Sequence, residues 1–288
     1  MIRRNSLLSS WSCSAILALA IASAGCHTPA ERAAAPIAEK NAAARGGLEA
    51  WRAVKSMSMS GKLEAGTPRD QLKLAMSYLR PTNEDKAEAR KALAHSGETD
   101  AEKPVQLPFV MEMKRPGKKR LEVQFQGQTA VQVFDGAKGW KLRPFLGRRE
   151  VEPYTAEEMR LASQETELDG PLIDYAAKGN KVELVGTEQV EGRAAYKLKV
   201  TLDNRQVRNV WVDTQTFLDV KIDGTRRMDG NPRTVWTYYR DYRAVEGLMI
   251  PHLLETTVEN VKGSEKIMVE VVSLNPELND QLFAKPEL

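Results

Sequence analysis

Alternation between apolar and polar residues dominates the sequence. From Met57 to Leu63 the odd-numbered residues are apolar or glycine, whereas the even-numbered residues are polar. A period of two is typical of a strand with one buried face. The same period returns in the segments Leu72–Tyr78, Phe109–Met113, Leu121–Phe125, Tyr196–Leu202, Leu218–Ile222 and Ile267–Val271.

Glycine-containing turns separate several of these segments. Asp135-Gly136, Glu191-Gly192 and Glu246-Gly247 each lie between two strand-like runs, where they predict hairpins. We therefore predict a mainly β (α+β) fold with an antiparallel sheet of about eleven strands.

Two segments have helical patterns. Apolar residues recurring at steps of three and four predict an N-terminal helix from Ile37 to Val54, with Trp51 on its apolar stripe. Asn41 interrupts this stripe, and Gly46-Gly47 is a point at which the helix can break.

The second helical segment covers residues 153–179. Thr155 and Glu158 form a capping box at its start, and Pro171 and Gly179 bracket a further short helix. These helices need a surface to cover, and the sheet supplies one. By contrast, residues 81–108 are charged and lack an apolar face, which predicts a polar surface insertion.

Residues 1–25 have the composition of a signal peptide. A basic start is followed by the apolar run Ala15–Ala22 and then by small residues up to Cys26. The run is shorter than the roughly 20 residues of a spanning helix. Cleavage before Cys26 would leave a lipidated cysteine, whereas cleavage after Ala24 would leave a soluble chain. Lipidation is the favoured interpretation, because a cysteine at this place is otherwise unexplained in a chain with so few cysteines.

This interpretation divides the chain into a signal peptide (1–25), a lipidated N-terminus with a tether (26–36) and one domain (37–288). We expect an exported protein of a bacterial envelope, anchored through lipid and facing the periplasm. His27, not aspartate, follows the cysteine, which is compatible with sorting to the outer membrane.

Composition excludes some classes of partner. Of the 2 cysteines, Cys13 leaves with the signal peptide, so the mature chain forms no internal disulfide. The 288 residues, 42% of them hydrophobic, are enough for a sizeable core. The formal net charge is +3, and basic residues are scattered among acidic ones, so we expect no nucleic-acid partner.

Motifs for catalysis are missing from the sequence. The histidines are His27, His95 and His252, and no two of them have zinc-binding spacing. The sequence contains no nucleophile elbow, phosphate loop or dinucleotide fingerprint. We therefore predict a protein that is not an enzyme and that requires neither metal nor cofactor.

Methionine is concentrated on the apolar strand face. Half of the 10 methionines lie there, namely Met57, Met59, Met76, Met111 and Met113. Flexible thioether side chains suit a surface that adapts to varied ligands, but they also fill ordinary cores. Both interpretations stay open from the residues alone.

Several phrases of the sequence resemble one protein superfamily. They are Met113-Lys-Arg-Pro-Gly-Lys-Lys-Arg-Leu-Glu122, Val133-Phe-Asp-Gly-Ala-Lys-Gly-Trp-Lys141, Val212-Asp-Thr-Gln-Thr-Phe-Leu218, Tyr242-Arg-Ala-Val-Glu-Gly-Leu-Met-Ile-Pro251 and Asn275-Pro-Glu-Leu-Asn-Asp-Gln-Leu-Phe-Ala-Lys-Pro286. As an ordered set they resemble the periplasmic lipoprotein carriers and receptors LolA and LolB, with relatives such as LppX and the sensor RseB.

The resemblance implies an incompletely closed half-barrel whose concave face carries lid or plug helices and holds acyl chains. The candidate lining residues are Trp51, Met57, Met59, Met76, Phe109, Met111, Met113, Val123, Phe125, Trp140, Tyr196 and Leu198. The implied function is binding of lipid or lipoprotein acyl chains during trafficking to or at the outer membrane. An alternative is an RseB-like sensor or interaction module that binds an envelope protein partner.

Overall fold

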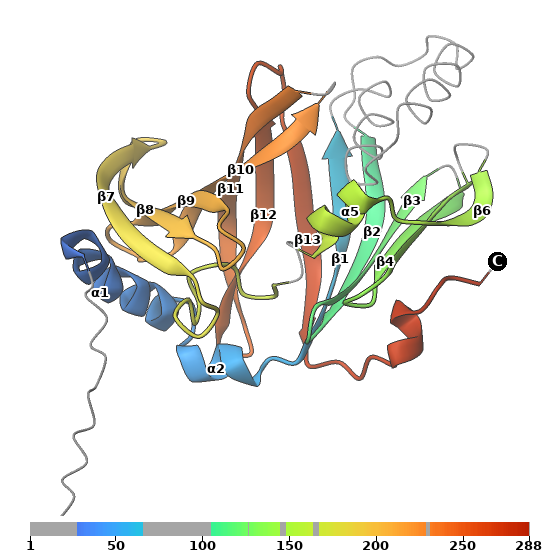
Figure 1. The fold of residues 1–288 in the computed structure, drawn as a ribbon, viewed down its shortest axis with the longest axis horizontal. Helices are drawn as coiled ribbons and strands as arrows, with labels where there is room; N and C mark the ends of the chain where they lie inside the picture. Colours follow the sequence, from blue (N-terminus) through green and yellow to red (C-terminus); the bar gives the residue numbers. More distant parts are fainter. Residues whose placement is uncertain are drawn as a thin grey trace, which may run out of the picture.

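A single antiparallel sheet of thirteen strands forms most of the chain that the computed structural model describes (Figure 1). The described residues are 28–65, 105–125, 127–144, 148–163, 167–228 and 231–287. The strands are β1 (Ser56–Ala65), β2 (Val105–Lys114), β3 (Lys118–Phe125), β4 (Gln128–Phe134), β5 (Gly139–Arg143), β6 (Arg148–Pro153), β7 (Lys181–Val190), β8 (Arg193–Thr201), β9 (Val207–Asp213), β10 (Asp219–Met228), β11 (Asn231–Val245), β12 (Leu248–Val258) and β13 (Glu265–Leu274).

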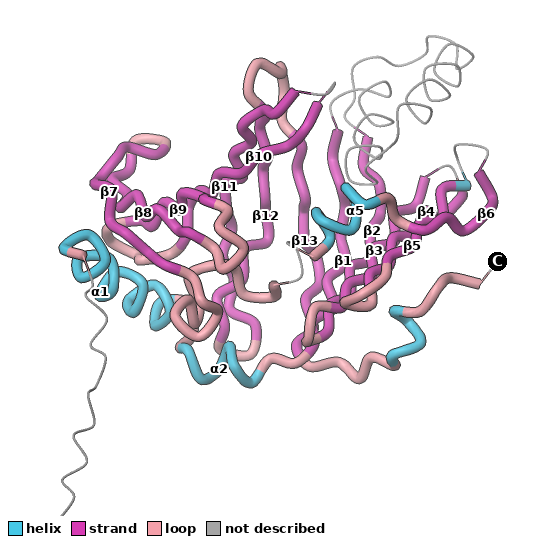
Figure 2. Tube along the Cα trace, viewed as in Figure 1, coloured by secondary structure: helices cyan, strands magenta, loops and turns pink. Residues whose placement is uncertain are grey.

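The strand order makes the sheet an incompletely closed half-barrel. Each strand pairs with its sequence neighbours, except that β1 also pairs with β13, and the edges are β6 and β7. The two edges are therefore consecutive in sequence, and the chain between them crosses the open side (Figure 2). The predicted half-barrel of mainly antiparallel strands is confirmed, with thirteen strands in the described chain instead of about eleven.

The N-terminal helix begins earlier than predicted. Helix α1 spans Pro29–Ala44 and helix α2 spans Leu48–Ala53. Thr28 and Glu31 close a capping box, and Pro29 fits the first helical position, where no backbone donor is needed. The described part of the expected tether is thus helical, and Ala34 within it is fully buried. The predicted break at Gly46-Gly47 separates the two helices, because both glycines have positive φ.

The described part of the segment between the sheet edges contains one helix, α5 (Ala156–Ala162), with the predicted capping box of Thr155 and Glu158. The second helix predicted there is wrong. Residues 170–179 form successive turns, and Asp174 adopts a left-handed backbone with φ 53°, which a continuous helix does not allow. We call residues 167–180 the plug segment. Of the predicted insertion, residues 105–108 belong to β2, and the remainder lies outside the described residues.

Helices α1 and α5 and the plug segment pack on the concave face of the sheet. Ile37 of α1 and Leu172 of the plug segment join a buried cluster with Leu198 and Val210 of the sheet. Asn41, which interrupts the apolar stripe, is buried and donates hydrogen bonds to Phe217 O and Asp219 Oδ1. The interruption in the sequence pattern is therefore a buried polar contact, in which the amide nitrogen of Asn41 is hydrogen-bonded.

On the convex face, the C-terminal helix and long charged side chains cover the sheet. Behind β4 and β5, a C-terminal 3-10 helix, η2 (Asp280–Phe283), buries Phe283 against Val133 and the partly buried Trp140. Across β8 to β11, Trp211 and Tyr238 flank Lys221, whose Nζ lies 4.5 Å and 5.4 Å from the two ring centroids. Long charged side chains thus shield the aromatic rings on this face.

Candidate ligand-binding face

An apolar wall occupies the concave face of β1, β2 and β3. Cross-strand pairing brings Met59 opposite Met111, and Met111 opposite Leu121. The next pairs along the strands place Phe109 opposite Gly61 and Val123. A side chain at Gly61 would collide with the Met268 carbonyl oxygen, so glycine is required where β1 shifts register against β13.

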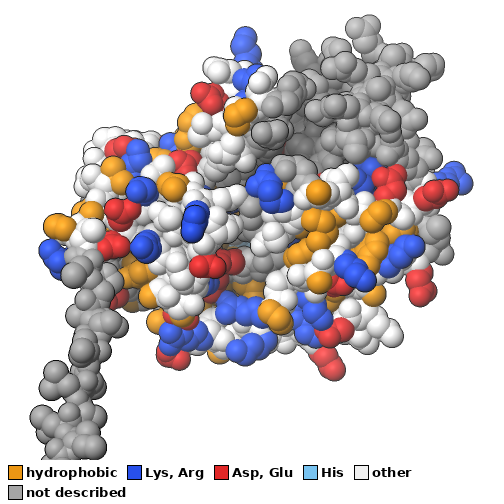
Figure 3. All heavy atoms as spheres, viewed as in Figure 1, with side chains coloured by type: hydrophobic (Ala, Val, Ile, Leu, Met, Phe, Trp, Pro, Cys, Tyr) orange, Lys and Arg blue, Asp and Glu red, His pale blue; other side chains and the backbone are white. Residues whose placement is uncertain are grey.

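The wall has a buried floor and a half-buried rim. Leu63, Phe109 and Val123 are buried at its centre. The apolar side chains packed around this centre keep part of their surface accessible, namely Met59, Met111, Phe125, Leu254, Ile267 and Val272. Figure 3 shows hydrophobic side chains gathered near α5 and the neighbouring strands. Partly accessible apolar side chains around a buried floor are suited to contact with an apolar ligand.

The wall ends in a buried polar cluster at β5. Lys141 and Arg143 point to the concave face and are each only 1% exposed. Lys141 Nζ lies 2.6 Å from Glu158 Oε1 of α5, and Arg143 Nη2 lies 2.8 Å from Glu152 Oε2 of β6. Buried cations are tolerated in proteins only when anions or acceptors neutralise them, and these carboxylates supply that neutralisation.

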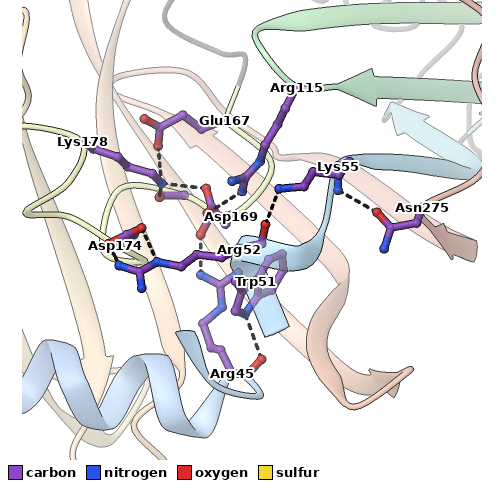
Figure 4. A network of polar contacts seen from close by, with 11 residues as sticks. Arg45, Trp51, Arg52, Lys55, Arg115, Glu167, Asp169, Asp174, Lys178 and Asn275 are labelled. Carbon is purple, nitrogen blue, oxygen red and sulfur yellow. Dashed lines mark hydrogen bonds and ion pairs between the residues drawn. The ribbon is translucent and has the colours of Figure 1, made fainter. Parts of the chain in front are cut away.

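The plug segment is held over the other half of the sheet by a clasp centred on Asp169, whose side chain is 3% exposed. Its carboxylate accepts hydrogen bonds from Arg115 and Lys178, both at 2.7 Å. Its backbone oxygen accepts from Arg45 Nη1, also at 2.7 Å (Figure 4). We call Asp169 with these three cations the Asp169 clasp. It joins the plug segment to the helices and to the β2–β3 turn.

A second link attaches the plug segment to α2. Arg52 donates two hydrogen bonds to the carboxylate of Asp174, from Nε and Nη2, both at 2.8 Å. The hydrogen bond from Arg52 lowers the pKa of Asp174 below its usual value. This pair lies nearer to solvent than the Asp169 clasp, since the side chain of Arg52 is 46% exposed.

Beneath the clasp lies a cluster of buried polar and charged side chains. Arg45 Nη1 is 3.3 Å from Asp219 Oδ2, and burial raises the pKa of the Asp219 carboxyl. Burial also raises the pKa of Tyr239 to about 12. Two atoms here, Arg45 Nε and Asn41 Oδ1, are buried without a hydrogen-bond partner in the described chain. Each such atom gives up the hydrogen bond that it makes with water in the unfolded chain, so it costs free energy on folding.

Comparison with known proteins supports the fold assignment. No family model matches the sequence, and no curated protein matches it. Among solved structures, a LolA superfamily protein from Nitrosomonas europaea is similar, with a TM-score of 0.53 at 13% identity over 88% of this chain and 97% of that one. The protein has a LolA-like fold.

Two further structures share this LolA-like fold. One is a domain from Vibrio parahaemolyticus assigned provisionally as an outer membrane lipoprotein-sorting protein, with a TM-score of 0.53, 10% identity and coverage of 88% and 97%. The other is a DUF1329 family protein from Desulfovibrio piger, with a TM-score of 0.53, 12% identity and coverage of 89% and 98%. At these identities the likeness concerns the architecture of the chain.

The LolA-like sheet brings most of the predicted lining residues onto its concave face. Five of them belong to the apolar wall: Met59, Phe109, Met111, Val123 and Phe125. Trp51 and Met57 pack with Ile173 beneath the plug segment, and Met113 is buried beside Met57. Tyr196 and Leu198 join the cluster under α1. Met76 and Cys26 lie outside the described residues.

The structure places Trp140 on the opposite face, which corrects the prediction for this residue. Trp140 pairs with Val133 and packs with Leu278 and Phe283 of the C-terminal tail. Both faces of β4 and β5 are covered, so the side chains pointing away from the wall are apolar as well. Sequence alternation therefore could not indicate which face is concave.

Sequence reasoning also missed Lys141 and Arg143. On β5 the apolar residues face the C-terminal tail, whereas the cations face the concave interior. This reverses the usual arrangement, in which charged side chains face the solvent. The sequence contained one hint of this polar cluster, namely Glu158, a carboxylate that the capping box places at the start of α5. No helix in the described chain is long and apolar enough to cross a membrane. The described residues also contain no cluster of potential metal ligands.

Proposed function

We propose that the protein is an envelope lipoprotein that binds acyl chains of lipids or lipoproteins on its concave apolar wall. The observation that carries this proposal is the half-buried rim of Met59, Met111 and Phe125 on a LolA-like half-barrel. Acyl chains would gain contact area there by displacing water, without any covalent step. Lipid on Cys26 would hold the protein at a membrane, within reach of its ligand.

Uptake of a fluorescent fatty acid by the purified mature protein tests this function. We expect saturable uptake that Met111→Asp abolishes, because a carboxylate on the wall would lose its hydration when an acyl chain binds. The matched control is Val110→Asp, on the same strand at the adjacent, outward-facing position, where the native side chain is 36% exposed. Equal loss in both variants would point to general disruption of β2.

A folded mature protein that takes up no lipid would contradict acyl-chain binding. That outcome would favour the alternative of an interaction module with a filled interior. Mass spectrometry of the mature N-terminus tests the anchor separately. We expect a diacylated or triacylated cysteine at position 26, whereas an N-terminus at Gly25 would make the protein a soluble carrier.

A further inference from the structure

Lys141, one of the two buried cations of β5, lies in line with the apolar wall. Direct cross-strand pairing forms one row across β1 to β5, composed of Met59, Met111, Leu121, Gln132 and Lys141. Neighbouring strands are about 4.8 Å apart, so the Lys141 backbone lies about 10 Å from that of Leu121. An amphiphile lying across the strands would therefore meet apolar side chains first and then a positive charge.

The anions beside these cations come from two different elements. Glu152 belongs to the sheet itself, at 2.8 Å from Arg143 and 4.0 Å from Lys141. Glu158 belongs to α5, and its carboxylate makes the shorter contact with Lys141. If α5 moves to admit a ligand, Lys141 loses its nearest carboxylate while it remains deep in the site. Glu152, at 4.0 Å, neutralises the buried Lys141 less well than Glu158 does, so an entering anion would be favoured.

We propose that the concave face selects lipids with an anionic phosphate headgroup, which takes the place of the Glu158 carboxylate at Lys141, beside Arg143 on the same strand. This inference rests on the proposed function, because it assigns a headgroup to the lipid whose chains lie on the apolar wall. Lysine and arginine are the side chains that hold phosphate in proteins, and guanidinium can donate two parallel hydrogen bonds to it. An uncharged lipid would bury the same chains without replacing the lost carboxylate.

Glu158→Gln is the decisive variant. Glutamine also serves at the third position of a capping box, so α5 keeps its N-terminal cap. The substitution removes the negative charge that competes with the headgroup. We expect fluorescent phosphatidylglycerol to bind about tenfold more tightly to this variant than to the wild type. A diacylglycerol with the same chains should gain much less, because it carries no charge that can pair with Lys141.

Lys141→Gln should have the opposite effect. Without the cation, phosphatidylglycerol should lose about tenfold in affinity, whereas diacylglycerol, which has no charge to pair with Lys141, should lose none. The matched control is Glu183→Gln, which breaks a Lys199–Glu183 pair of 2.8 Å on an accessible part of the sheet. This control variant should bind phosphatidylglycerol and diacylglycerol as the wild type does. Circular dichroism checks folding, and if Lys141→Gln does not fold, Glu158→Gln still decides the question.

The outcomes separate this inference from the proposed function. Equal phosphatidylglycerol affinity in the wild type and Glu158→Gln, with normal diacylglycerol binding, would overturn headgroup selection and leave acyl-chain binding intact. Failure of both lipids to bind would overturn both proposals. Inorganic phosphate, added as competitor, should not displace phosphatidylglycerol, because it lacks acyl chains. Displacement by phosphate alone would make this a site for free phosphate and contradict the lipid assignment.

Discussion

The two halves of the sheet use the same concave face differently. Over β7 to β10, α1 and the plug segment cover the face, and Leu172 and Leu198 are almost completely buried. Over β1 to β3, the rim residues Met59, Met111 and Phe125 keep part of their surface accessible. One half is packed as an ordinary protein core, whereas the other retains apolar surface for additional contacts.

This difference divides one continuous sheet into a closed half and a half with accessible apolar side chains. The packed half holds its cover with ion pairs, chiefly the Asp169 clasp, and with the apolar residues of α1. In the other half, α5 contributes Glu158 to a buried ion pair beside the wall. Polar contacts of this kind can exchange for ligand contacts more readily than close apolar packing can.

The largest expected difference between the halves concerns a buried charge. Leu198→Asp should unfold the protein, because an unpaired carboxylate in a closed core costs a large part of the total stability. Phe125→Asp should leave a folded sheet, since the rim gives the carboxylate access to water, but it should abolish lipid uptake. Circular dichroism and fatty-acid uptake measure the two effects. A folded Leu198→Asp variant would show that the β7–β10 half is not a closed core.

Sequence patterns predicted the sheet because its strands obey a simple rule over most of their length. The alternation from Met57 to Leu63 predicted strand β1, and the capping box of Thr155 and Glu158 located the start of α5. The rule failed where both faces are covered, as it did for Trp140. It also failed for the second helix of residues 153–179, where the left-handed backbone of Asp174 produces turns. Such features depend on tertiary contacts that a local pattern does not contain.

Substitutions that leave a cavity should also destabilise the plugged half more than the wall, but by a smaller amount. Ile173→Ala, in the plug segment, should lower the free energy of unfolding by about 3 kcal/mol, because truncating a fully buried side chain leaves a cavity. Met111→Ala should lower it by about 1 kcal/mol, since part of that side chain is already in water. Urea denaturation measures both values. Equal losses would mean that the wall is packed as tightly as the plugged half.

The smallest expected effect concerns the solvent-facing link between the plug segment and α2. Asp174→Asn removes the ion pair with Arg52 but preserves the left-handed backbone, which asparagine adopts more readily than most residues. We expect a slightly lower urea midpoint than for the wild type at neutral pH. Arg52→Gln removes the same pair from the other side, so it and the double variant should resemble Asp174→Asn.

The pH dependence of that difference identifies the carboxylate as its source. Since the hydrogen bond from Arg52 lowers the pKa of Asp174 in the folded state, the pair stabilises the protein fully above the unfolded-state pKa of about 3.9. Its contribution is lost as the pH falls through the lower, folded-state value. The midpoints of the wild type and Asp174→Asn should therefore begin to converge below about pH 4 and coincide once the pH is below the folded-state pKa of Asp174. A difference that stayed constant with pH would assign the effect to backbone conformation at residue 174.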